Sequence, residues 1–255
     1  MRMMRLIDQR TRRPFFVALE GSTWRRLTGD VGKQPRPAGK ISSRFMRVLP
    51  VCGPSKIVLV GLNYADHAQE LGYDIPGTPV IFLKPPSSVI GNKDAIVYPD
   101  GVDRIDHEAE LAIVMKKEAH KVLPKDVHKY ILGYTCLNDV TARNLQKQDG
   151  QWTRSKSFDT FCPIGPWIET GLTPEAAEDL NISCRVNGQT RQSSSTKHFI
   201  FGIREMVSFI SHCMTLHPFD IISTGTPPGV GPLHVGDVVE VEIEKVGTLV
   251  NKVSK

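Results

Sequence analysis

The chain has 255 residues, of which 40% are hydrophobic and 23% are charged. These proportions are those of an ordinary globular protein, and they exclude a largely disordered chain, a collagen-like chain and a coiled coil. The length allows one large domain or two small ones, and a core can form without disulfides. The formal net charge of +5 is uneven, because residues 1–50 carry 12 Lys and Arg against 3 Asp and Glu.

The basic excess is interpreted as the solvated face of a small N-terminal module, because no recognition motif or interleaved aromatic residues accompany it. We therefore expect no nucleic-acid partner. The N-terminus lacks the apolar region of a signal peptide, and no run approaches 18 apolar residues, so we expect a cytoplasmic protein without a membrane partner. The five cysteines are far apart with no CxxC pattern, which favours reduced core thiols.

Short apolar runs alternate with Gly, Pro and Arg in residues 1–52, which predicts a small β-rich domain there and a second domain over 53–255. The mixed order of strands and helices favours an α+β, strand-rich fold over a doubly wound parallel sheet. The predicted strands are 56–61, 80–83, 95–98, 108–115, 134–138, 181–186, 190–194, 221–223 and 238–245. The predicted helices are 64–71, 125–132, 141–148 and 203–214.

The first candidate site is the pair Glu108 and Glu110 in the sequence DHEAE. Residues i and i+2 of a strand point to the same face, so the two carboxylates should project together and repel each other unless a cation lies between them. Carboxylate ligands favour Mg²⁺, Mn²⁺ or Ca²⁺. The same spacing occurs in VEVEIE at 239–244, where we expect a solvent-facing row, so spacing alone does not separate the two cases.

Three further segments carry candidate groups. Asp139 follows a predicted strand and precedes a helix, where it is either a helix N-cap or a ligand. His67 and Glu70 lie three residues apart on a predicted helix, so they are either surface residues or a dyad in which the carboxylate orients the imidazole as a general base. Lys156 is either a surface lysine or a cation that stabilises an oxyanion.

The loop 224–232 (TGTPPGVGP) is rich in glycine but matches no phosphate-binding fingerprint. Its backbone N–H groups can still approach an anionic substrate. The chain also contains no G-x-S-x-G sequence, which disfavours a serine hydrolase of the α/β-hydrolase type.

Taken in order, seven stretches resemble the fumarylacetoacetate hydrolase (FAH) family. They are GLNYADHAQELG (61–72), PVIFLKPPSSVIG (79–91), DHEAELAIVMKK (106–117), YTCLNDVTARNLQ (134–146), KSFDTFCPIGPWI (156–168), RVNGQTRQSSST (185–196) and DIISTGTPPGVGP (220–232). The resemblance implies a mixed β-sandwich roll with a small N-terminal β domain, usually as a homodimer. It is specific for the family and much less specific for the reaction.

The resemblance also implies roles for nine residues. Mg²⁺ or Mn²⁺, with Ca²⁺ possible in crystals, is expected to be held by Glu108, Glu110 and Asp139. His67 and Glu70 are expected on a lid that orders over the substrate, and Lys156 is expected to contact the substrate near the metal. The expected pocket residues are Arg143, Gln146 and Thr226.

One departure from the family pattern concerns the turn before the last motif, where Phe219 stands in place of a glycine. Phenylalanine does not adopt positive φ as cheaply as glycine, so we expect this turn to differ. A second departure is His107, which stands where an aromatic residue often precedes the first metal ligand.

The expected chemistry is metal-stabilised enolate formation from a 2-oxo or 1,3-diketo acid, in a pathway of aromatic compound catabolism. The retained dyad favours C–C bond hydrolysis of acylpyruvates. The alternatives at the same site are isomerisation of a 2-hydroxydienedioate and decarboxylation of an oxaloacetate-like or 5-oxopent-3-ene-1,2,5-tricarboxylate-like acid. A binding protein without catalytic activity is a further alternative, against which the presence of all these residues together argues.

Overall fold

The computed structural model of the chain describes residues 1–33, 35–71 and 74–255, and leaves the side chains of residues 43, 67, 68 and 71 outside the described part. Strands predominate over helices, as an α+β, strand-rich fold requires. Five strands lie in the N-terminal region: β1 (Arg2–Asp8), β2 (Pro14–Glu20), β3 (Thr23–Thr28), β4 (Arg36–Lys40) and β5 (Met46–Val48).

The rest of the chain contains the other strands and all the α-helices of the described residues. The strands are β6 (Ile57–Gly61), β7 (Val80–Lys84), β8 (Val89–Ile90), β9 (Ala95–Val97), β10 (Ile105–His107), β11 (Ala109–Met115), β12 (Ile131–Asn138), β13 (Thr141–Ala142), β14 (Cys162–Glu169), β15 (Asn181–Val186), β16 (Gln189–Ser195), β17 (Ile221–Ser223), β18 (Gly231–Leu233), β19 (Val238–Ile243) and β20 (Gly247–Ser254). The helices are α1 (Ala65–Leu71), α2 (Arg143–Asp149), α3 (Thr153–Lys156), α4 (Pro174–Ala177) and α5 (Ile203–Cys213). Four short 3₁₀ helices, η1 to η4, cover Ser43–Phe45, Pro86–Ser88, Pro124–Lys129 and Thr196–His198.

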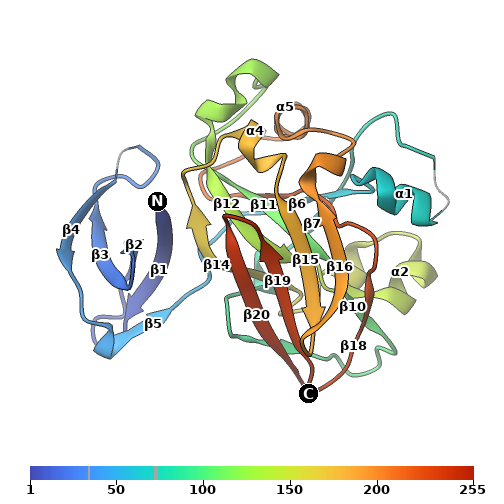
Figure 1. Cartoon of the computed structure of the whole chain (residues 1–255), viewed down its shortest axis with the longest axis horizontal. Helices are drawn as coiled ribbons and strands as arrows, with labels where there is room; N and C mark the ends of the chain where they lie inside the picture. Colours follow the sequence, from blue (N-terminus) through green and yellow to red (C-terminus); the bar gives the residue numbers. More distant parts are fainter. Residues whose placement is uncertain (34, 72–73) are drawn as a thin grey trace.

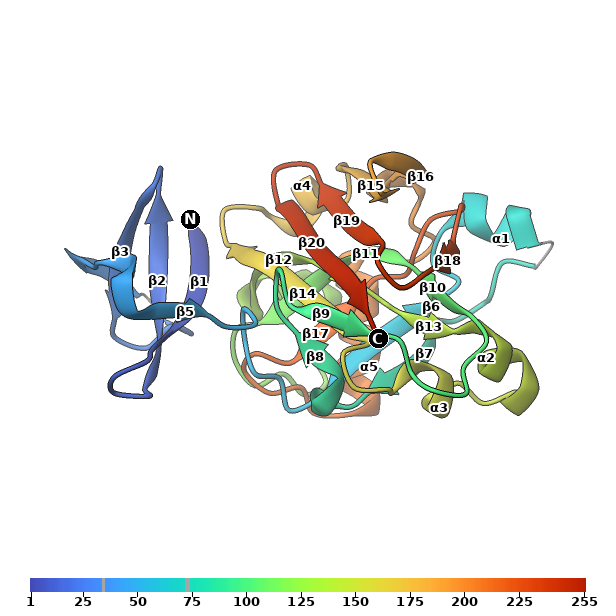
Figure 2. The same cartoon turned by 90° about the horizontal axis from the view of Figure 1, so that it is seen from below.

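The largest sheet runs in the order β4-β3-β2-β1-β14-β12-β11-β17-β6-β7, with β5 and β8 attached at its sides. The N-terminal strands join it through β1, where Arg2 pairs with Glu169 and Met3 with Ile168. Figures 1 and 2 show these strands to one side of the remaining chain, with α1 and α2 at the opposite end. The expected boundary at residue 52 stays a prediction.

The central strand β11 is buried along its whole length, which explains its nearly continuous apolar sequence. Its two faces belong to two cores. Leu111 and Ile113 pack with Val241 of the five-stranded sheet β16-β15-β19-β20-β9. Ala112 and Val114 pack on the side of Met3, Ala18 and Ile57. The five-stranded sheet thus packs on the face of the large sheet that carries Leu111 and Ile113, consistent with the expected mixed β-sandwich architecture.

The hairpin predicted around Asn187-Gly188 is confirmed. β15 and β16 pair antiparallel on either side of this dipeptide, and both residues have positive φ, at 52° and 77°. This is the geometry of a type I′ turn. The glutamates at 240 and 242 lie on the partly exposed face of β19, opposite its buried apolar side chains, as expected. They form ion pairs with Arg185 at 3.2 and 2.6 Å.

Several predicted elements differ from the structure. The helix expected over 125–132 is a 3₁₀ helix that ends at Lys129, and Ile131 already begins β12. The strand expected over 108–115 breaks at Glu108, which lies between β10 and β11. The helix expected from 141 begins at Arg143, because Thr141 and Ala142 pair with β10. Sequence reasoning did not predict β14 or β20.

The turn before β17 holds its phenylalanine in a backbone conformation that glycine adopts more readily. Phe219 adopts a φ of 69°, the left-handed region that favours glycine. Its ring stacks on Phe16 of β2, with centroids 5.4 Å apart and planes at 10°. The residue that contacts the N-terminal strands, Phe219, is thus also the residue with the strained backbone.

Four of the five cysteines are buried free thiols, but Cys213 is exposed, so the expectation of a core position fails there. Burial raises the pKa of Cys52, Cys162 and Cys184 to about 12. Within the described ranges, no helix combines the length and the hydropathy that crossing a membrane requires.

Candidate active site

The expected metal ligands meet at one end of three neighbouring antiparallel strands of the large sheet, β12, β11 and β17. β11 runs antiparallel to both β12 and β17, so the beginning of β11 lies beside the ends of these two strands. Glu108 and Glu110 stand at the beginning of β11, Asp139 directly follows β12, and Ser223 ends β17. The backbone N–H of Asp139 donates to the carbonyl of Glu108 at 2.9 Å, which fixes the junction.

The three carboxylates converge as predicted. Glu108, Glu110 and Asp139 each offer an oxygen within 4.8 Å of the others, and all three residues are buried. Asp139 does not cap a helix, because α2 begins four residues later with Ala142 at its N-cap. The structure therefore favours the ligand interpretation of Asp139 over the capping one.

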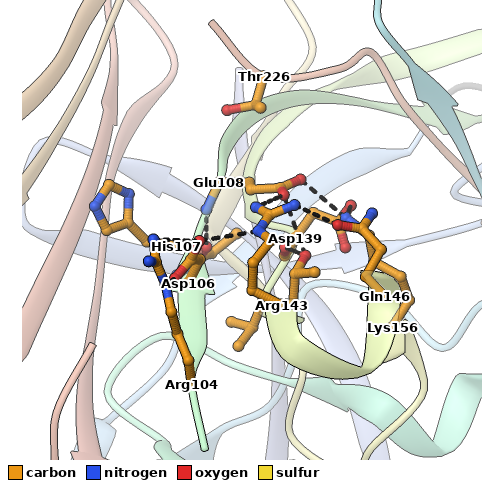
Figure 3. A network of polar contacts seen from close by, with 12 residues as sticks. Arg104, Asp106, His107, Glu108, Asp139, Arg143, Gln146, Lys156 and Thr226 are labelled. Carbon is orange, nitrogen blue, oxygen red and sulfur yellow. Dashed lines mark hydrogen bonds and ion pairs between the residues drawn. The ribbon is translucent and has the colours of Figure 1, made fainter. Parts of the chain in front are cut away.

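Two buried lysines surround Asp139. Lys156 Nζ lies 2.6 Å from Asp139 Oδ2 and 2.9 Å from Glu108 Oε2, and Lys84 Nζ lies 2.8 Å from Asp139 Oδ1 (Figure 3 shows Lys156). Burial alone would lower the pKa of Lys156, but the charges of Asp139 and Glu108 outweigh it and raise that pKa. The Lys156 side chain therefore stays a cation at neutral pH.

Glu108 and Glu110 sit in opposite electrostatic environments. Burial would raise the pKa of Glu108, but Lys156 and Arg143 reverse this and lower it. The pKa of Glu110 is raised well above its ordinary value, first by burial and then by the charges of Asp139 and Glu108. Its Oε2 accepts hydrogen bonds from Ser223 Oγ and from the N–H of Gly225, at 3.1 Å for the latter. Among the described residues, no cation pairs with Glu110.

This donor set fits a divalent metal ion. Three hard carboxylate oxygens face one another, which suits Mg²⁺ or Mn²⁺ better than a softer ion. Burial is the main cause of the raised pKa of Glu110, and the repulsion by Asp139 and Glu108 raises it further. A cation bound among them would relieve that repulsion.

Arg143 and Gln146 also lie at the cluster, as the family resemblance implies. Arg143 reaches Glu108 Oε1 at 2.5 Å and Asp106 Oδ2 at 2.9 Å, and it donates to Gln146 Oε1 at 2.5 Å. The two residues are one helical turn apart on α2, so they present polar groups on the same side (Figure 3). All three guanidinium nitrogens are thus engaged within the protein, and a guanidinium is also the type of group that binds carboxylates.

Thr226 lies above Glu108 at the start of the glycine-rich loop (Figure 3). Its hydroxyl donates to the Ala109 carbonyl at 2.9 Å and accepts from Gln192 Nε2 at 2.8 Å. Thr226 is thereby fixed to the strand that carries the glutamates.

The helix of the expected dyad lies beside the same loop. Glu70 on α1 accepts a hydrogen bond from the N–H of Gly229 at 3.2 Å, and Asp66 accepts one from Ser194 Oγ at 2.8 Å. The side chain of His67 lies outside the described residues. The dyad itself therefore stays a prediction.

Comparison with known proteins identifies the family. The fumarylacetoacetate (FAA) hydrolase C-terminal family matches residues 56–254, which is most of the chain. The chain belongs to the FAH family.

Relatives in this family come from all three domains of life. An uncharacterized protein of Methanocaldococcus jannaschii is 58% identical over 200 residues, covering 78% of this chain and 83% of that protein. The mitochondrial oxaloacetate tautomerase Fahd2a of Rattus norvegicus is 44% identical over 219 residues, covering 83% of this chain and 70% of that protein. The crystal structure of 5-carboxymethyl-2-hydroxymuconate delta-isomerase from Mycobacterium smegmatis superposes with a TM-score of 0.91 at 40% identity, covering 100% of this chain and 99% of that one.

Sequence reasoning missed two buried residues of this FAH-family site, Lys84 and Asp106. Besides Asp139, Lys84 Nζ donates to the carbonyls of Val140 at 2.9 Å and Phe161 at 2.7 Å. The available signal was its position at the end of the apolar strand VIFLK. A buried lysine is rare unless it is paired, so a lysine in such a strand indicates a charged partner. Asp106 holds Arg143 and Arg104.

Proposed function

We propose that this FAH-family enzyme interconverts the keto and enol forms of a 2-oxo acid through a stabilised enolate. The observation that carries the proposal is the convergence of two cations, Lys156 and Arg143, on Glu108 beside the carboxylate cluster. The negative charge of an enolate lies mainly on the former keto oxygen. Fixed cations beside that oxygen therefore stabilise the enolate more than the keto form.

The names of two relatives support isomerisation over other enolate reactions. The rat relative is an oxaloacetate tautomerase, and the Mycobacterium smegmatis protein is a delta-isomerase of a hydroxymuconate. Both names describe movement of a proton or double bond in a 2-oxo or 2-hydroxy acid. The proposed substrate of this chain is therefore a 2-oxo or 2-hydroxy acid that carries at least one further carboxylate.

Each cation has a separate role in the proposal. Arg143 exchanges its contact with Glu108 for the substrate carboxylate, which orients the 2-oxo group toward the cluster. Lys156, buried and protonated, donates a hydrogen bond from Nζ to the oxygen on which the charge develops. Thr226 borders the substrate on the side of the glycine-rich loop.

Glu108, Glu110 and Asp139 would hold the divalent ion, for which we propose Mg²⁺ or Mn²⁺. When bound, the ion supplies a Lewis acid that polarises the keto group and lowers the pKa of the neighbouring C–H. Lys84 holds Asp139 from the side of the protein interior, so it acts on the carboxylate rather than on the substrate.

A second candidate is C–C bond hydrolysis of an acylpyruvate. The attachment of α1 to the glycine-rich loop through Glu70 and Gly229 favours it, because this contact brings the helix of His67 and Glu70 to the edge of the site. Decarboxylation of the same class of acid uses the same enolate. In both cases the carboxylate cluster and Lys156 keep the roles given above.

Product analysis separates the three reactions. The Mg²⁺-loaded protein is incubated in D₂O with oxaloacetate, acetylpyruvate and a 2-hydroxydienedioate, with and without EDTA, and followed by NMR. We expect deuterium exchange and enol–keto conversion that EDTA abolishes. Acetate and pyruvate from acetylpyruvate would establish the hydrolase instead, and release of CO₂ would establish the decarboxylase.

Two lysine variants provide the matched control for that experiment. Lys156→Met should lower the rate by about 10²-fold or more, as loss of an oxyanion-stabilising group does. Lys252→Met removes the same charge from an exposed position of β20 and should leave the rate unchanged. Equal rates in both variants would contradict the role of Lys156.

We also propose that the chain forms a homodimer. β7 is the last strand in the order of the large sheet, and its Val80 and Leu83 are 40% and 46% exposed. An edge strand with exposed apolar side chains is suited to association with another chain. Light scattering on a size-exclusion column tests this, and a monomeric mass at micromolar concentration would contradict it.

A further inference from the structure

The residue between the two glutamates, Ala109, lies just beyond the end of a β-ladder. β17 ends at Ser223, which pairs with Ala112 of β11. The next residue of the loop, Thr224, still donates from its N–H to the Leu111 carbonyl at 3.0 Å. Among the described strands, none pairs with Ala109 on this side. Because Ala109 is fully buried, its backbone N–H and carbonyl need other partners there.

Two side chains take the place of the missing strand. The Ala109 N–H donates to Gln192 Oε1 at 3.0 Å, and the Ala109 carbonyl accepts from Thr226 Oγ1 at 2.9 Å. Gln192 Nε2 donates to Thr226 Oγ1 and to the Pro227 carbonyl, both at 2.8 Å. The side chains that hold Ala109 are thus also bonded to each other. We call this closed ring of Ala109, Gln192 and Thr226 the Ala109 clamp.

Gln192 reaches the clamp from the other sheet. It lies on β16, at the edge of the five-stranded sheet, and it is buried between the exposed residues Arg191 and Ser193. The β15–β16 register shifts between Cys184 and Arg185, so that Arg191 is the extra residue of a β-bulge. A bulge redirects side chains out of the regular alternation. The bulge next to Gln192 therefore accompanies its inward direction.

The partners of Gln192 fix the orientation of its amide. Oε1 must be the acceptor, because the N–H of Ala109 only donates, and Nε2 must be the donor, because the carbonyl of Pro227 only accepts. Oε1 also lies 3.0 Å from Nδ1 of His107. The Thr226 hydroxyl receives a hydrogen bond from Nε2 and gives its own proton to Ala109. The clamp thus needs an acceptor and two donors on one uncharged side chain, which glutamine supplies.

We propose that Gln192 is a positioning residue of the metal site. It fixes the backbone of Ala109 and thereby the directions in which Glu108 and Glu110 leave the chain. Glu108 lies at the break between β10 and β11, where no continuous strand sets its direction. Groups that orient metal ligands from behind are typically worth 10–100-fold in metal affinity. The inference rests on the proposed function only in taking the two glutamates as ligands.

The test measures metal affinity without a substrate, so the reaction does not enter. Mn²⁺ is titrated into the full chain, and the free ion is measured by electron paramagnetic resonance. Gln192→Met keeps the length of the side chain but lacks the amide, so it should bind Mn²⁺ about 10-fold or more weakly. Gln189→Met, at an exposed position of the same strand, should bind Mn²⁺ as the natural chain does. Unchanged affinity in Gln192→Met would overturn the proposal.

A second buried amide of the same sheet separates positioning from general support of the fold. Asn251 on β20 is 2% exposed, and its Nδ2 donates to the carbonyls of Gly91 and Asp94 at 2.9 and 2.8 Å. Asn251→Leu should therefore lower the free energy of unfolding, as Gln192→Met should, but it should leave the affinity for Mn²⁺ unchanged. An equal loss of affinity in both variants would make Gln192 a structural residue only and overturn its positioning role.

Hydrogen exchange of the Ala109 amide, followed by NMR in EDTA, tests the clamp without a metal. We expect exchange about 10-fold faster in Gln192→Met than in the natural chain, and a smaller change in Asn251→Leu. Equally slow exchange in Gln192→Met would show that Gln192 does not hold this backbone. A natural chain that binds no Mn²⁺ would contradict the ligand assignment of the proposed function, whereas equal binding by the natural chain and Gln192→Met would contradict the positioning role alone.

Discussion

Phe219 stacks on Phe16 across the contact between the catalytic part of the chain and the N-terminal strands, and it does so from a backbone conformation that favours glycine. The two residues are far apart in sequence, and Phe219 directly precedes Asp220 and β17. The ring contact gives a physical reason for a phenylalanine at this turn. It stabilises the contact between the two parts while the backbone retains its strain.

This relationship predicts an order of stabilities. Phe219→Gly loses the stacked ring but relieves the left-handed backbone, so its free energy of unfolding should fall by about 1–2 kcal/mol. Phe219→Ala loses the ring and keeps the strain, so it should be about 1 kcal/mol less stable again. Urea unfolding followed by circular dichroism measures both differences.

Phe16→Ala completes a double-mutant cycle with Phe219→Ala. We expect a coupling free energy of about 0.5–1.5 kcal/mol, the range for paired aromatic rings. Additive effects of the two alanine substitutions would show that the stack does not stabilise the fold.

Asp220 predicts a pH dependence of stability. Its carboxylate accepts from the N–H groups of Ser55, Lys56 and His217 and pairs with Lys56 Nζ at 2.6 Å. Burial would raise the pKa of Asp220, but these hydrogen bonds and the lysine outweigh it and lower the pKa overall. The carboxylate therefore stabilises the fold above its unfolded pKa of about 3.9, and this contribution is lost as the pH falls toward the folded value.

Asp220→Asn should thus unfold about 2–3 kcal/mol more easily at pH 7, because it loses hydrogen bonds to a charged acceptor. The difference from the natural chain should shrink as the pH is lowered from 5 to 2. Denaturation curves at several pH values test this. A difference that stays constant over the range would contradict the assigned cause.

The local pattern of the sequence predicts much of this fold. The apolar runs at 56–61 and 221–223 and the helix at 203–214 have the expected type, because their periodicity matches their burial. The break of the strand at Glu108 was not predictable from the same pattern. At this break the N–H of Glu108 donates to the side chain of Asn138 on the neighbouring strand β12, a contact that no local pattern predicts.

For the site as well, the sequence predicts some residues, and only the folded structure identifies the others. The E-x-E spacing identifies Glu108 and Glu110 as candidates, but 240 and 242 share that spacing and face solvent. What separates them is burial and a third carboxylate from another strand, which are properties of the folded chain. Lys84 escaped notice because its partner Asp139 lies 55 positions further along the chain and no local pattern joins them.

Lys84 is expected to position Asp139 and to support the fold around it. Lys84→Met leaves Asp139 and the carbonyls of Val140 and Phe161 without their donor, so stability should fall by about 3 kcal/mol and turnover should fall with it. Lys156→Met should lower turnover at least as much, but it leaves the carbonyls of Val140 and Phe161 bonded to Lys84. Unfolding measurements and product analysis on both variants distinguish the two lysines, and an unaffected Lys84→Met protein would exclude the positioning role.

His67→Ala tests the dyad. Only hydrolysis needs an activated water, so enol–keto conversion should change only a few-fold in this variant, whereas any hydrolysis of acetylpyruvate by the natural chain should fall by about 10²-fold or more. Gln69→Ala, at an exposed position of the same helix, should change neither rate. If His67→Ala lowers both reactions equally, the dyad does not activate water in this protein.

Glu110→Gln makes the metal site testable without a substrate. The folded pKa of Glu110 lies above its unfolded value, first because of burial and then because of Asp139 and Glu108, so at neutral pH its ionisation favours unfolding. A glutamine keeps an oxygen for Ser223 and Gly225 but carries no charge. In EDTA the variant should therefore be more stable than the natural chain. The gain should be about 1.4 kcal/mol for each unit by which folding raises the pKa of Glu110, up to the pH of the measurement.

With metal added, the natural chain should become more stable than Glu110→Gln. Mg²⁺ at a hundred times its Kd stabilises a protein that binds it only when folded by about 2.7 kcal/mol, and the natural chain should show this increase. Glu110→Gln should show little of it, because one of three ligands is now neutral. Thermal unfolding of both proteins in EDTA and in MgCl₂ measures the four values. A variant that is destabilised in EDTA and responds fully to Mg²⁺ would mean that Glu110 is a structural residue and not a ligand.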